Sequence, residues 1–261
     1  MKNRILQALI LVCTIVCLIT IPCSASETYS WYCRHTKNHL QPSTEHCPDF
    51  VEEYGAKYVD KQNYDPQADE KVIYLTFDAG YENGNVEKIL DVLKEENVPA
   101  AFFVLANLVQ RNTDLVIRMA EEGHTVCNHT ARHMDMSLQG DEAFLEELHT
   151  LEKLYFEKTG KTLSAYYRPP EGRFSIQNLK CAQENNYKTV FWSFAYPDWD
   201  NRKQMSPTRA KEIILENAHN GEVMLLHPTS QTNAEILKDV IVALKADGYR
   251  FGTLDALFEN G

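Results

Sequence analysis

Short runs of apolar and β-branched residues alternate from residue 71 onward with longer segments in which apolar residues recur every three or four positions. The short runs are typical of buried strands, and the longer segments of amphipathic helices. Seven runs predict strands at residues 72–77, 100–105, 124–128, 165–168, 188–194, 222–227 and 249–253. Strands that alternate with helices pair in parallel through right-handed crossovers. The pattern therefore predicts an α/β fold of parallel strands, either a (β/α) barrel or a doubly wound sheet.

The beginning of the chain follows another pattern. Residues 5–22 form an almost unbroken apolar run that follows two basic residues and precedes small residues at 23–25. This is the layout of a secretory signal, so residues 1–25 are predicted to be a signal peptide. The run is also nearly long enough to span a bilayer, so an uncleaved membrane anchor is an alternative. Both alternatives place the rest of the chain outside the cytoplasm, either secreted or associated with the cell wall.

Residues 26–68 are polar and contain three prolines. They predict an N-terminal extension with little regular structure, packed on a main domain at residues 69–261. Cys33 and Cys47 lie close together in this extension and could close a small disulfide loop in an oxidising compartment. Because three histidines lie between them, a Cys/His metal site is an alternative, and free thiols are a third.

The charge of the chain limits its partners. Lysine and arginine number 26 against 37 aspartate and glutamate residues, and residues 1–25 contain two of the basic residues and none of the acidic ones. No cluster of basic residues occurs elsewhere. Such a surface argues against nucleic acid and anionic lipid as partners. We therefore expect membrane contact only through the N-terminal apolar run.

The predicted strands end at residues suited to acid, base or metal chemistry. In parallel α/β folds the functional residues lie just past the carboxyl ends of the strands. The residues at these places are Asp78, His129, His133, Arg168, Asp198, Trp199 and His227. His129 and His133 are four positions apart, and on a helical turn both imidazoles would point the same way, as metal ligands do. Zinc in such a site would lower the pKa of a bound water.

Each of these residues also has a purely structural alternative. Asp78 could cap a helix, and His227 could be a core histidine because it follows an apolar strand. As a general base, Asp78 would have to reach the bound water, and a nearby Arg168 would keep it ionised. A His227 close to Asp198 would be held cationic and could protonate a leaving amine.

Five motifs in order resemble those of the polysaccharide deacetylases with NodB homology, carbohydrate esterase family 4. They are TFDAG at 76–80, HTARH at 129–133, RPPEG at 168–172, DW at 198–199 and LLH at 225–227. The resemblance covers about residues 70–258. It implies a distorted (β/α) barrel of about seven parallel strands that removes N-acetyl groups from glycans with one divalent metal, often zinc.

The resemblance also implies a role for each position. Asp78 is implied as the base, His129 and His133 as the metal ligands, and Arg168 as the partner that keeps Asp78 charged. The implied reaction is attack of water on an amide carbonyl, followed by collapse to acetate and a free amine.

On the other side of the implied site, Asp198 orients His227, the acid that protonates the departing sugar amine. The remaining implied residues bind substrate. The side chains of Trp199 and Leu225 wall the acetyl pocket. Backbone N–H groups near Glu171 and Gly172 help to bind the oxyanion.

Position 79 departs from the family pattern, which has a second Asp there as the third metal ligand. Ala79 cannot bind a metal, so zinc, the metal we expect, would have two protein ligands. Two interpretations follow. The chain is either a catalytically inactive cell-wall glycan-binding module or a member of a branch that dispenses with this ligand.

Several segments resemble the muramic δ-lactam-forming de-N-acetylases of spore-forming bacteria, which carry a non-acidic residue at this place. These segments are TFDAGYENG, NHT, RPPEGRFS and FWSFAYPDW. The resemblance implies action on N-acetylmuramic acid of peptidoglycan, in the spore cortex or cell wall, and we expect a monomer. N-acetylglucosamine in peptidoglycan or in chitin-like oligomers is the alternative target.

Overall fold

The structure is a computed structural model that describes residues 27–259. The signal peptide or anchor predicted at residues 1–25 lies outside these described residues. All seven predicted strand runs form strands within this range, and the run at 188–194 is divided in two. The strands of the main sheet are β2 (Lys71–Ala79), β3 (Ala101–Val104), β4 (Thr125–Asn128), β5 (Tyr166–Tyr167), β7 (Lys188–Thr189), β8 (Phe194–Ala195), β9 (Glu222–Leu226) and β10 (Tyr249–Phe251).

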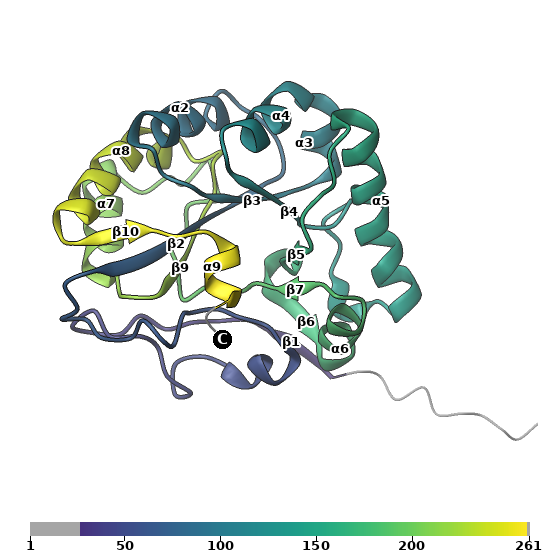
Figure 1. Cartoon of the computed structure of the whole chain (residues 1–261), viewed down its shortest axis with the longest axis horizontal. Coiled ribbons are helices and arrows are strands. Elements are labelled where there is room, and N and C mark those ends of the chain that lie inside the picture. Colours follow the sequence, from purple (N-terminus) through teal and green to yellow (C-terminus); the bar gives the residue numbers. More distant parts are fainter. Residues whose placement is uncertain (1–26, 260–261) are drawn as a thin grey trace, which may run out of the picture.

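The main sheet is parallel and curls into a half-barrel, whose edge strands β7 and β8 do not pair with each other. Its strands follow the order β7-β5-β4-β3-β2-β9-β8, and β10 pairs with the beginning of β2 (Figure 1). The two outer strands belong to one chain segment. The N–H of Val190 donates to the Tyr167 carbonyl of β5 at 2.8 Å, and the N–H of Ser193 donates to the Val223 carbonyl of β9 at 3.0 Å. Because this one segment bonds to both edges, the fold is a distorted (β/α) barrel and not an open doubly wound sheet.

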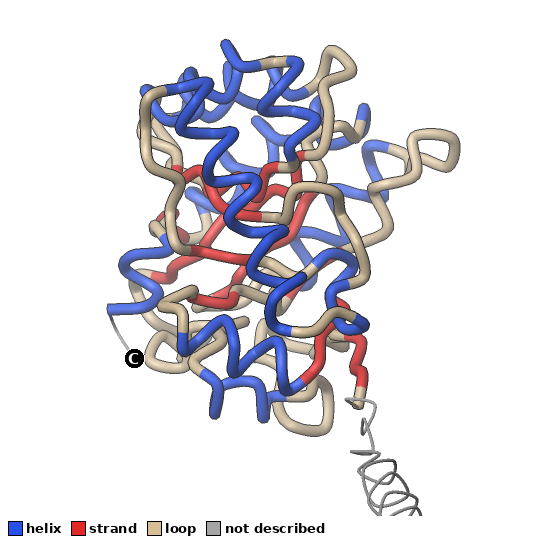
Figure 2. The backbone as a smooth tube through the Cα atoms, turned by 90° about the vertical axis from the view of Figure 1, so that its right-hand side faces the viewer, coloured by secondary structure: helices blue, strands red, loops and turns tan. Residues whose placement is uncertain are grey.

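Helices surround the strands, which lie at the centre of the molecule (Figure 2). The α-helices are α2 (Val86–Glu96), α3 (Ala106–Arg111), α4 (Thr113–Glu121), α5 (Asp141–Thr159), α6 (Ile176–Glu184), α7 (Pro207–Asn217), α8 (Gln231–Ala246) and α9 (Leu254–Glu259). Short 3-10 helices are η1 (Asp49–Tyr54), η2 (Met136–Leu138) and η3 (Pro170–Gly172). Within residues 27–259, no helix has the length and apolar character needed to cross a membrane.

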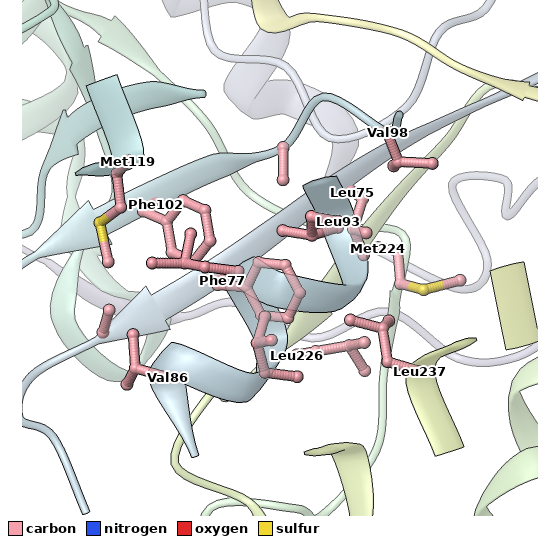
Figure 3. Packing of buried hydrophobic residues seen from close by; sticks show 14 of the residues in the cluster. Leu75, Phe77, Val86, Leu93, Val98, Phe102, Met119, Met224, Leu226 and Leu237 are labelled. Carbon is pink, nitrogen blue, oxygen red and sulfur yellow. The ribbon is translucent and has the colours of Figure 1, made fainter. Parts of the chain in front are cut away.

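The central strand β2 is buried on both faces. Leu75 and Phe77 pack with Val86 of α2 in a large apolar cluster between the sheet and the helices (Figure 3). Tyr74 belongs to a second cluster, which fills the barrel. Burial of each such side chain contributes about 1.5–3 kcal/mol. Side chains alternate between the two faces of a strand. Asp78, four positions after Tyr74, therefore lies on the same inner face, at the carboxyl end of β2.

The extension, residues 27–68, packs against the barrel segment that joins β7 to β8. Its strand β1 (Thr28–Ser30) pairs in antiparallel fashion with β6 (Arg173–Ser175). An apolar cluster is shared between the two parts. From the extension and then from the barrel, it contains Trp31, Cys47, Val51, Ala56, Tyr58, Val59, Phe174, Leu179 and Phe191. The extension is therefore bonded to the barrel, while a domain boundary at residue 69 stays a prediction.

Candidate active site

A pocket of about 640 Å³ lies at the carboxyl ends of the barrel strands. Seven of the ten residues predicted for the site line it: Asp78, His129, His133, Glu171, Trp199, Leu225 and His227. Further lining comes from outside that set: Gly80, Tyr81, Leu105, Trp192, Ala195, Tyr196 and Thr229. Arg168, Asp198 and Gly172 are buried behind the lining. The motifs thus converge on one cavity from five places in the chain.

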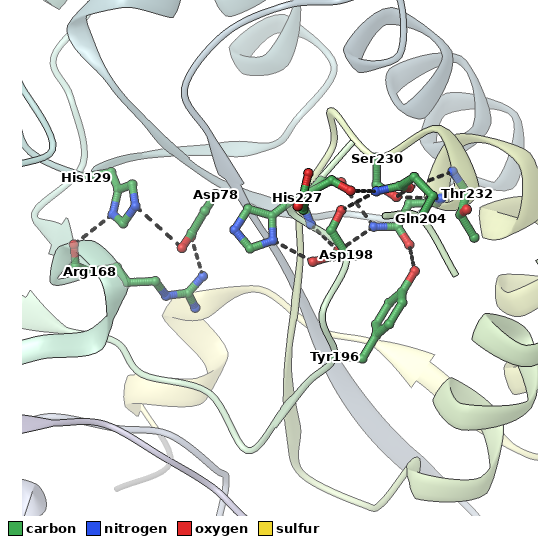
Figure 4. A network of polar contacts seen from close by, with 11 residues as sticks. Asp78, His129, Arg168, Tyr196, Asp198, Gln204, His227, Ser230 and Thr232 are labelled. Atoms are coloured by element: carbon green, nitrogen blue, oxygen red, sulfur yellow. Dashed lines mark hydrogen bonds and ion pairs between the residues drawn. The ribbon is translucent and has the colours of Figure 1, made fainter. Parts of the chain in front are cut away.

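Asp78 and Arg168 form an ion pair at one side of the pocket (Figure 4). Arg168 Nη1 donates to Asp78 Oδ1 at 2.8 Å. The guanidinium is fully buried, and its other N–H groups donate to the Thr76 hydroxyl at 2.9 Å and to the Val190 carbonyl at 3.1 Å. The Phe103 ring packs against it, with its centroid 4.1 Å from Cζ. A buried charge is tolerated when it is paired and fully hydrogen-bonded, so these contacts hold a permanent positive charge beside Asp78.

The surroundings keep Asp78 ionised. Burial raises the pKa of its carboxyl group, but the positive charges of His129, when protonated, and of Arg168 outweigh burial, so the pKa lies below its ordinary value. Burial lowers the pKa of His129 to about 4. His129 is therefore neutral near pH 7, and Arg168 is the partner that remains charged.

His129 and His133 lie in an irregular turn, so the helical turn predicted from their spacing is wrong. Thr130 and His133 have φ angles of 71° and 58°, which a right-handed helix does not allow. The Asn128 side chain accepts the Thr130 N–H at 2.9 Å, and the Thr130 hydroxyl accepts the His133 N–H at 3.0 Å. These local hydrogen bonds replace helical ones. Both rings still line the pocket, with centroids 5.1 Å apart.

The His129 ring is oriented as that of a metal ligand would be. His129 Nδ1 lies 2.9 Å from the Arg168 carbonyl, which can only accept, so Nδ1 carries the proton and Nε2 has a free lone pair. Nε2 lies 3.5 Å from Asp78 Oδ2. A carbonyl that fixes one ring nitrogen is a common way to orient a metal-binding histidine. Within residues 27–259, no three His, Cys, Asp or Glu side chains are grouped as a metal site, and the roles of His129 and His133 as ligands stay a prediction.

His227 and Asp198 form a second pair, in which the His227 ring lies nearer to Asp78 and Asp198 lies beyond it (Figure 4). His227 Nδ1 donates to Asp198 Oδ1 at 2.7 Å, and the His227 backbone N–H donates to Asp198 Oδ2 at 2.7 Å. Burial lowers the pKa of His227, but the Asp198 carboxylate outweighs burial, so the pKa is raised above its ordinary value. Because Nδ1 is engaged, Nε2 is the nitrogen that can give a proton to a molecule in the pocket.

Two residues that the sequence analysis did not identify hold this second pair. Asn233 of α8 is buried, and its Nδ2 donates to Asp198 Oδ2 at 2.6 Å and to the His227 carbonyl at 3.0 Å. Its Oδ1 accepts the Tyr196 hydroxyl. Gln204 Nε2 donates to the Asp198 carbonyl at 2.8 Å. The signal that could have revealed Asn233 is an amide within the buried stripe of an otherwise amphipathic helix.

The four residues predicted to bind substrate differ in exposure and in bonding. Leu225 is buried, whereas the Trp199 side chain is 61% exposed and its ring centroid lies 6.4 Å from that of His227. Glu171 and Gly172 have φ angles of 54° and 66°. The Gly172 N–H donates to the Pro169 carbonyl at 3.0 Å, so this N–H is engaged within the turn and not directed at the pocket.

Ala79 is fully buried in the apolar cluster that faces the helices, and it does not line the pocket. Its neighbour Asp78 points the other way, as alternation along a strand requires. The position at which the family pattern has a further acidic residue is therefore occupied here by a small apolar side chain in a packed environment.

Comparisons with known proteins agree with this geometry. Residues 65–190 match the family model for polysaccharide deacetylases. The peptidoglycan-N-acetylmuramic acid deacetylase PdaA of Bacillus subtilis is 38% identical over 233 residues, which cover 89% of this chain and 86% of that protein. A peptidoglycan-N-acetylglucosamine deacetylase of Bacillus cereus is 36% identical over 194 residues, which cover 72% of this chain and 88% of that protein.

The solved structure of B. subtilis PdaA, a family 4 carbohydrate esterase, has a TM-score of 0.82 to this chain at 38% identity and covers 90% of this chain and 99% of that one. Both sequence and fold therefore agree with the motifs. The chain belongs to the polysaccharide deacetylase family, carbohydrate esterase family 4.

Proposed function

We propose that this protein is a hydrolase that removes the N-acetyl group from peptidoglycan, with N-acetylmuramic acid as its target, and that it acts outside the cytoplasm. The observation that carries the proposal is the pairing of an ionised carboxylate with a cationic imidazole across one pocket. Arg168 helps to lower the pKa of Asp78, which favours its ionised form, and Asp198 raises the pKa of His227, which favours its protonated form. Amide hydrolysis needs both a base and an acid in those protonation states at one pH.

The proton transfers follow from the two pairs. Asp78 Oδ2, the oxygen not engaged by Arg168, accepts a proton from the attacking water. As the tetrahedral intermediate collapses, His227 donates the Nε2 proton to the departing sugar nitrogen, and acetate and a free amine leave. Leu225, Trp199 and Glu171 line the pocket, and in this proposal Leu225 and Trp199 wall the acetyl group.

His129 and His133 would hold the metal, for which zinc is the expected ion. When bound, it supplies Lewis acidity at the acetyl carbonyl and lowers the pKa of the attacking water. The carbonyl of Arg168 keeps the His129 ring in the ligating orientation. Arg168 thus serves two neighbours, with its side chain on Asp78 and its backbone on His129.

Muramic acid is favoured over N-acetylglucosamine by the extent of the similarity. The match to the N-acetylmuramic acid deacetylase covers 89% of this chain, which is more than residues 69–261 make up, so it extends into the N-terminal extension. The match to the N-acetylglucosamine deacetylase covers 72% of this chain. After deacetylation of muramic acid, the free amine can cyclise with the lactyl carboxylate to give the δ-lactam.

The test treats defined muropeptides with the full chain in the presence of zinc and identifies by mass spectrometry which sugar loses its acetyl group. We expect acetate release and loss of acetyl from the muramic residue. Loss from the glucosamine residue alone would transfer the proposal to the alternative target. If muramic, glucosaminyl and chitin-type substrates all stay acetylated with zinc, manganese or cobalt, the chain is a glycan-binding module and not an enzyme.

Ala79→Asp tests the ligand set without measuring activity. The new carboxylate would lie in an apolar cluster, so without metal it should lower the melting temperature by several degrees, because an unpaired buried charge is costly. If it reaches the metal, zinc should raise the melting temperature more in the variant than in the wild type. Ala79→Asn is the control of matched size. Equal zinc-dependent shifts in all three proteins would place the metal away from position 79.

A further inference from the structure

Cys33 and Cys47 face each other in the extension. The N–H of Arg34 donates to the His46 carbonyl at 2.9 Å, so two stretches of the extension lie side by side. Cys47 is part of the buried apolar cluster of the extension, and Cys33 packs against the same cluster, so the two side chains lie in one place. The interaction between the two thiols raises the pKa of Cys33 and lowers that of Cys47.

The surroundings of the pair suit a protected bond with one accessible sulfur. Cys47 is buried in the apolar cluster of Trp31 and Tyr58, while Cys33 is half-buried and packs against the same cluster. The other two cysteines of the described chain, Cys127 and Cys181, are buried in two separate clusters. Among residues 27–259, Cys33 and Cys47 are therefore the one pair placed to react.

The structure does not support the alternative of a Cys/His metal site in this loop. No group of three or more potential ligands occurs among the described residues. His35 Nε2 lies 3.1 Å from the Ala195 carbonyl, and His39 Nδ1 lies 2.6 Å from the Ala218 carbonyl. His46 Nδ1 contacts the Ser43 hydroxyl at 2.9 Å. The histidines between the cysteines thus bind the barrel or their own turn.

We propose that Cys33 and Cys47 form a disulfide bond that closes the loop of residues 33–47 against the barrel. This loop carries His35, His39 and Gln41, and the Gln41 amide donates to the Asp60, Asn63 and Asn220 carbonyls at 2.7–2.9 Å. His35 contacts the carbonyl of Ala195, a residue that lines the pocket. The bond holds these contacts together by restricting the unfolded loop.

The reaction balances with a small-molecule disulfide as the oxidant. The more accessible thiol, Cys33, first loses its proton to solvent, and its thiolate then attacks one sulfur of oxidised glutathione, which gives a mixed disulfide and releases one glutathione thiolate. Cys47 then attacks the Cys33 sulfur and releases the second glutathione thiolate. Two electrons pass from the protein thiols to glutathione, and two protons end on the two glutathione molecules. The hydrogen bond from Cys33 lowers the pKa of the Cys47 thiol, which favours its thiolate.

Peptide mapping tests the bond directly. Trypsin cleaves after Arg34 and Lys37, so Cys33 and Cys47 fall in separate peptides that only a disulfide keeps together. The full chain is equilibrated with oxidised and reduced glutathione, alkylated under denaturing conditions and digested without reductant. We expect one linked pair, with the sulfurs assigned by fragmentation, and alkylated Cys127 and Cys181. Alkylation of both Cys33 and Cys47, or a link from Cys47 to another cysteine, overturns the proposal.

A melting experiment gives a second, independent readout. Reduction of the wild-type protein should lower its melting temperature by about 5–10 °C, because the closed loop spans about 15 residues. Cys33→Ser should melt where the reduced wild type does and should not respond to reductant. If reductant leaves the wild-type melting temperature unchanged, or shifts Cys33→Ser equally, the bond is absent.

Discussion

Two aspartates of the site are bonded in opposite ways. Asp78 gives one oxygen to Arg168 and turns the other toward the pocket and His129. Asp198 gives both oxygens to the protein, one to the His227 ring and the other to the His227 N–H and Asn233. Asp78 lines the pocket and Asp198 does not. The same side chain is thus placed as a reactant in one pair and as an orienting group in the other.

The two aspartates also differ in the kind of cation that each one contacts. Arg168 cannot lose its proton, so it serves as a fixed charge that keeps Asp78 able to accept a proton. His227 can lose its proton, and Asp198 keeps it protonated. We therefore propose Asp78, beside a fixed cation, as the base and His227, a titratable cation beside Asp198, as the acid. Removing each element in turn tests this assignment.

The largest effect is expected from Asp78→Asn. The amide keeps a hydrogen-bond acceptor for Arg168 but does not accept the proton of water, so kcat should fall by about 10²–10⁴-fold. Acetate release from muropeptides measures the rate, and circular dichroism checks the fold. A variant with wild-type kcat would remove Asp78 from the reaction and leave it as a structural partner of Arg168.

Asp198→Asn should change the pH dependence. The pKa of His227 is raised, so its protonated form prevails below the ordinary value of about 6.5 and is lost as pH rises through the raised pKa. The wild-type kcat should fall along this alkaline limb. Without the Asp198 charge, burial dominates, so the limb should move to lower pH and kcat at pH 7.5 should fall roughly 10²-fold. An unmoved limb would mean that another group is the acid.

Asn233→Ala should have a smaller effect on the same side of the pocket. The variant loses the amide that positions both Asp198 and the His227 carbonyl, and kcat should fall by about 10-fold with little change in KM. Tyr196→Phe is the matched control because its hydroxyl bonds Asn233 but not Asp198. If Asn233→Ala lowers the melting temperature but leaves kcat and the pH profile intact, Asn233 has a purely structural role.

Much of the barrel could be predicted because its strands leave strong local signals. The strands are short runs rich in β-branched or aromatic residues, and most of them are followed by a residue of functional type, as in Ile73–Asp78. The closure was not predictable in the same way. The sequence predicts one strand at 188–194. In the structure the beginning of this run, β7, pairs with β5, and its end, in β8, pairs with β9. Which edge a strand joins depends on residues distant in sequence.

The local shape of the site was harder to predict than its composition. A spacing of four residues between His129 and His133 indicates a helical turn, but the side chains of Asn128 and Thr130 compete for the backbone N–H groups and produce another turn. Asn233 could not be recognised from a local motif, because its contact with Asp198 joins residues 35 positions apart in the sequence. The roles of the predicted residues, and the metal, remain predictions.

The smallest effect is expected from Trp31→Phe, which tests whether the extension supports one side of the pocket only. Trp31 Nε1 donates to the Trp192 carbonyl at 3.0 Å, and its ring stacks on Phe191, whose carbonyl accepts from Arg168. Phenylalanine keeps the stacking and loses one hydrogen bond, so KM for muropeptides should rise about two- to three-fold as the Trp192 wall loosens. Because no described contact links Trp31 to Asp198 or His227, the alkaline limb of kcat should stay in place. A shift of the alkaline limb of kcat would show that the extension couples the two sides of the pocket. The environments of Asp78 and His227 would then not be independent of each other.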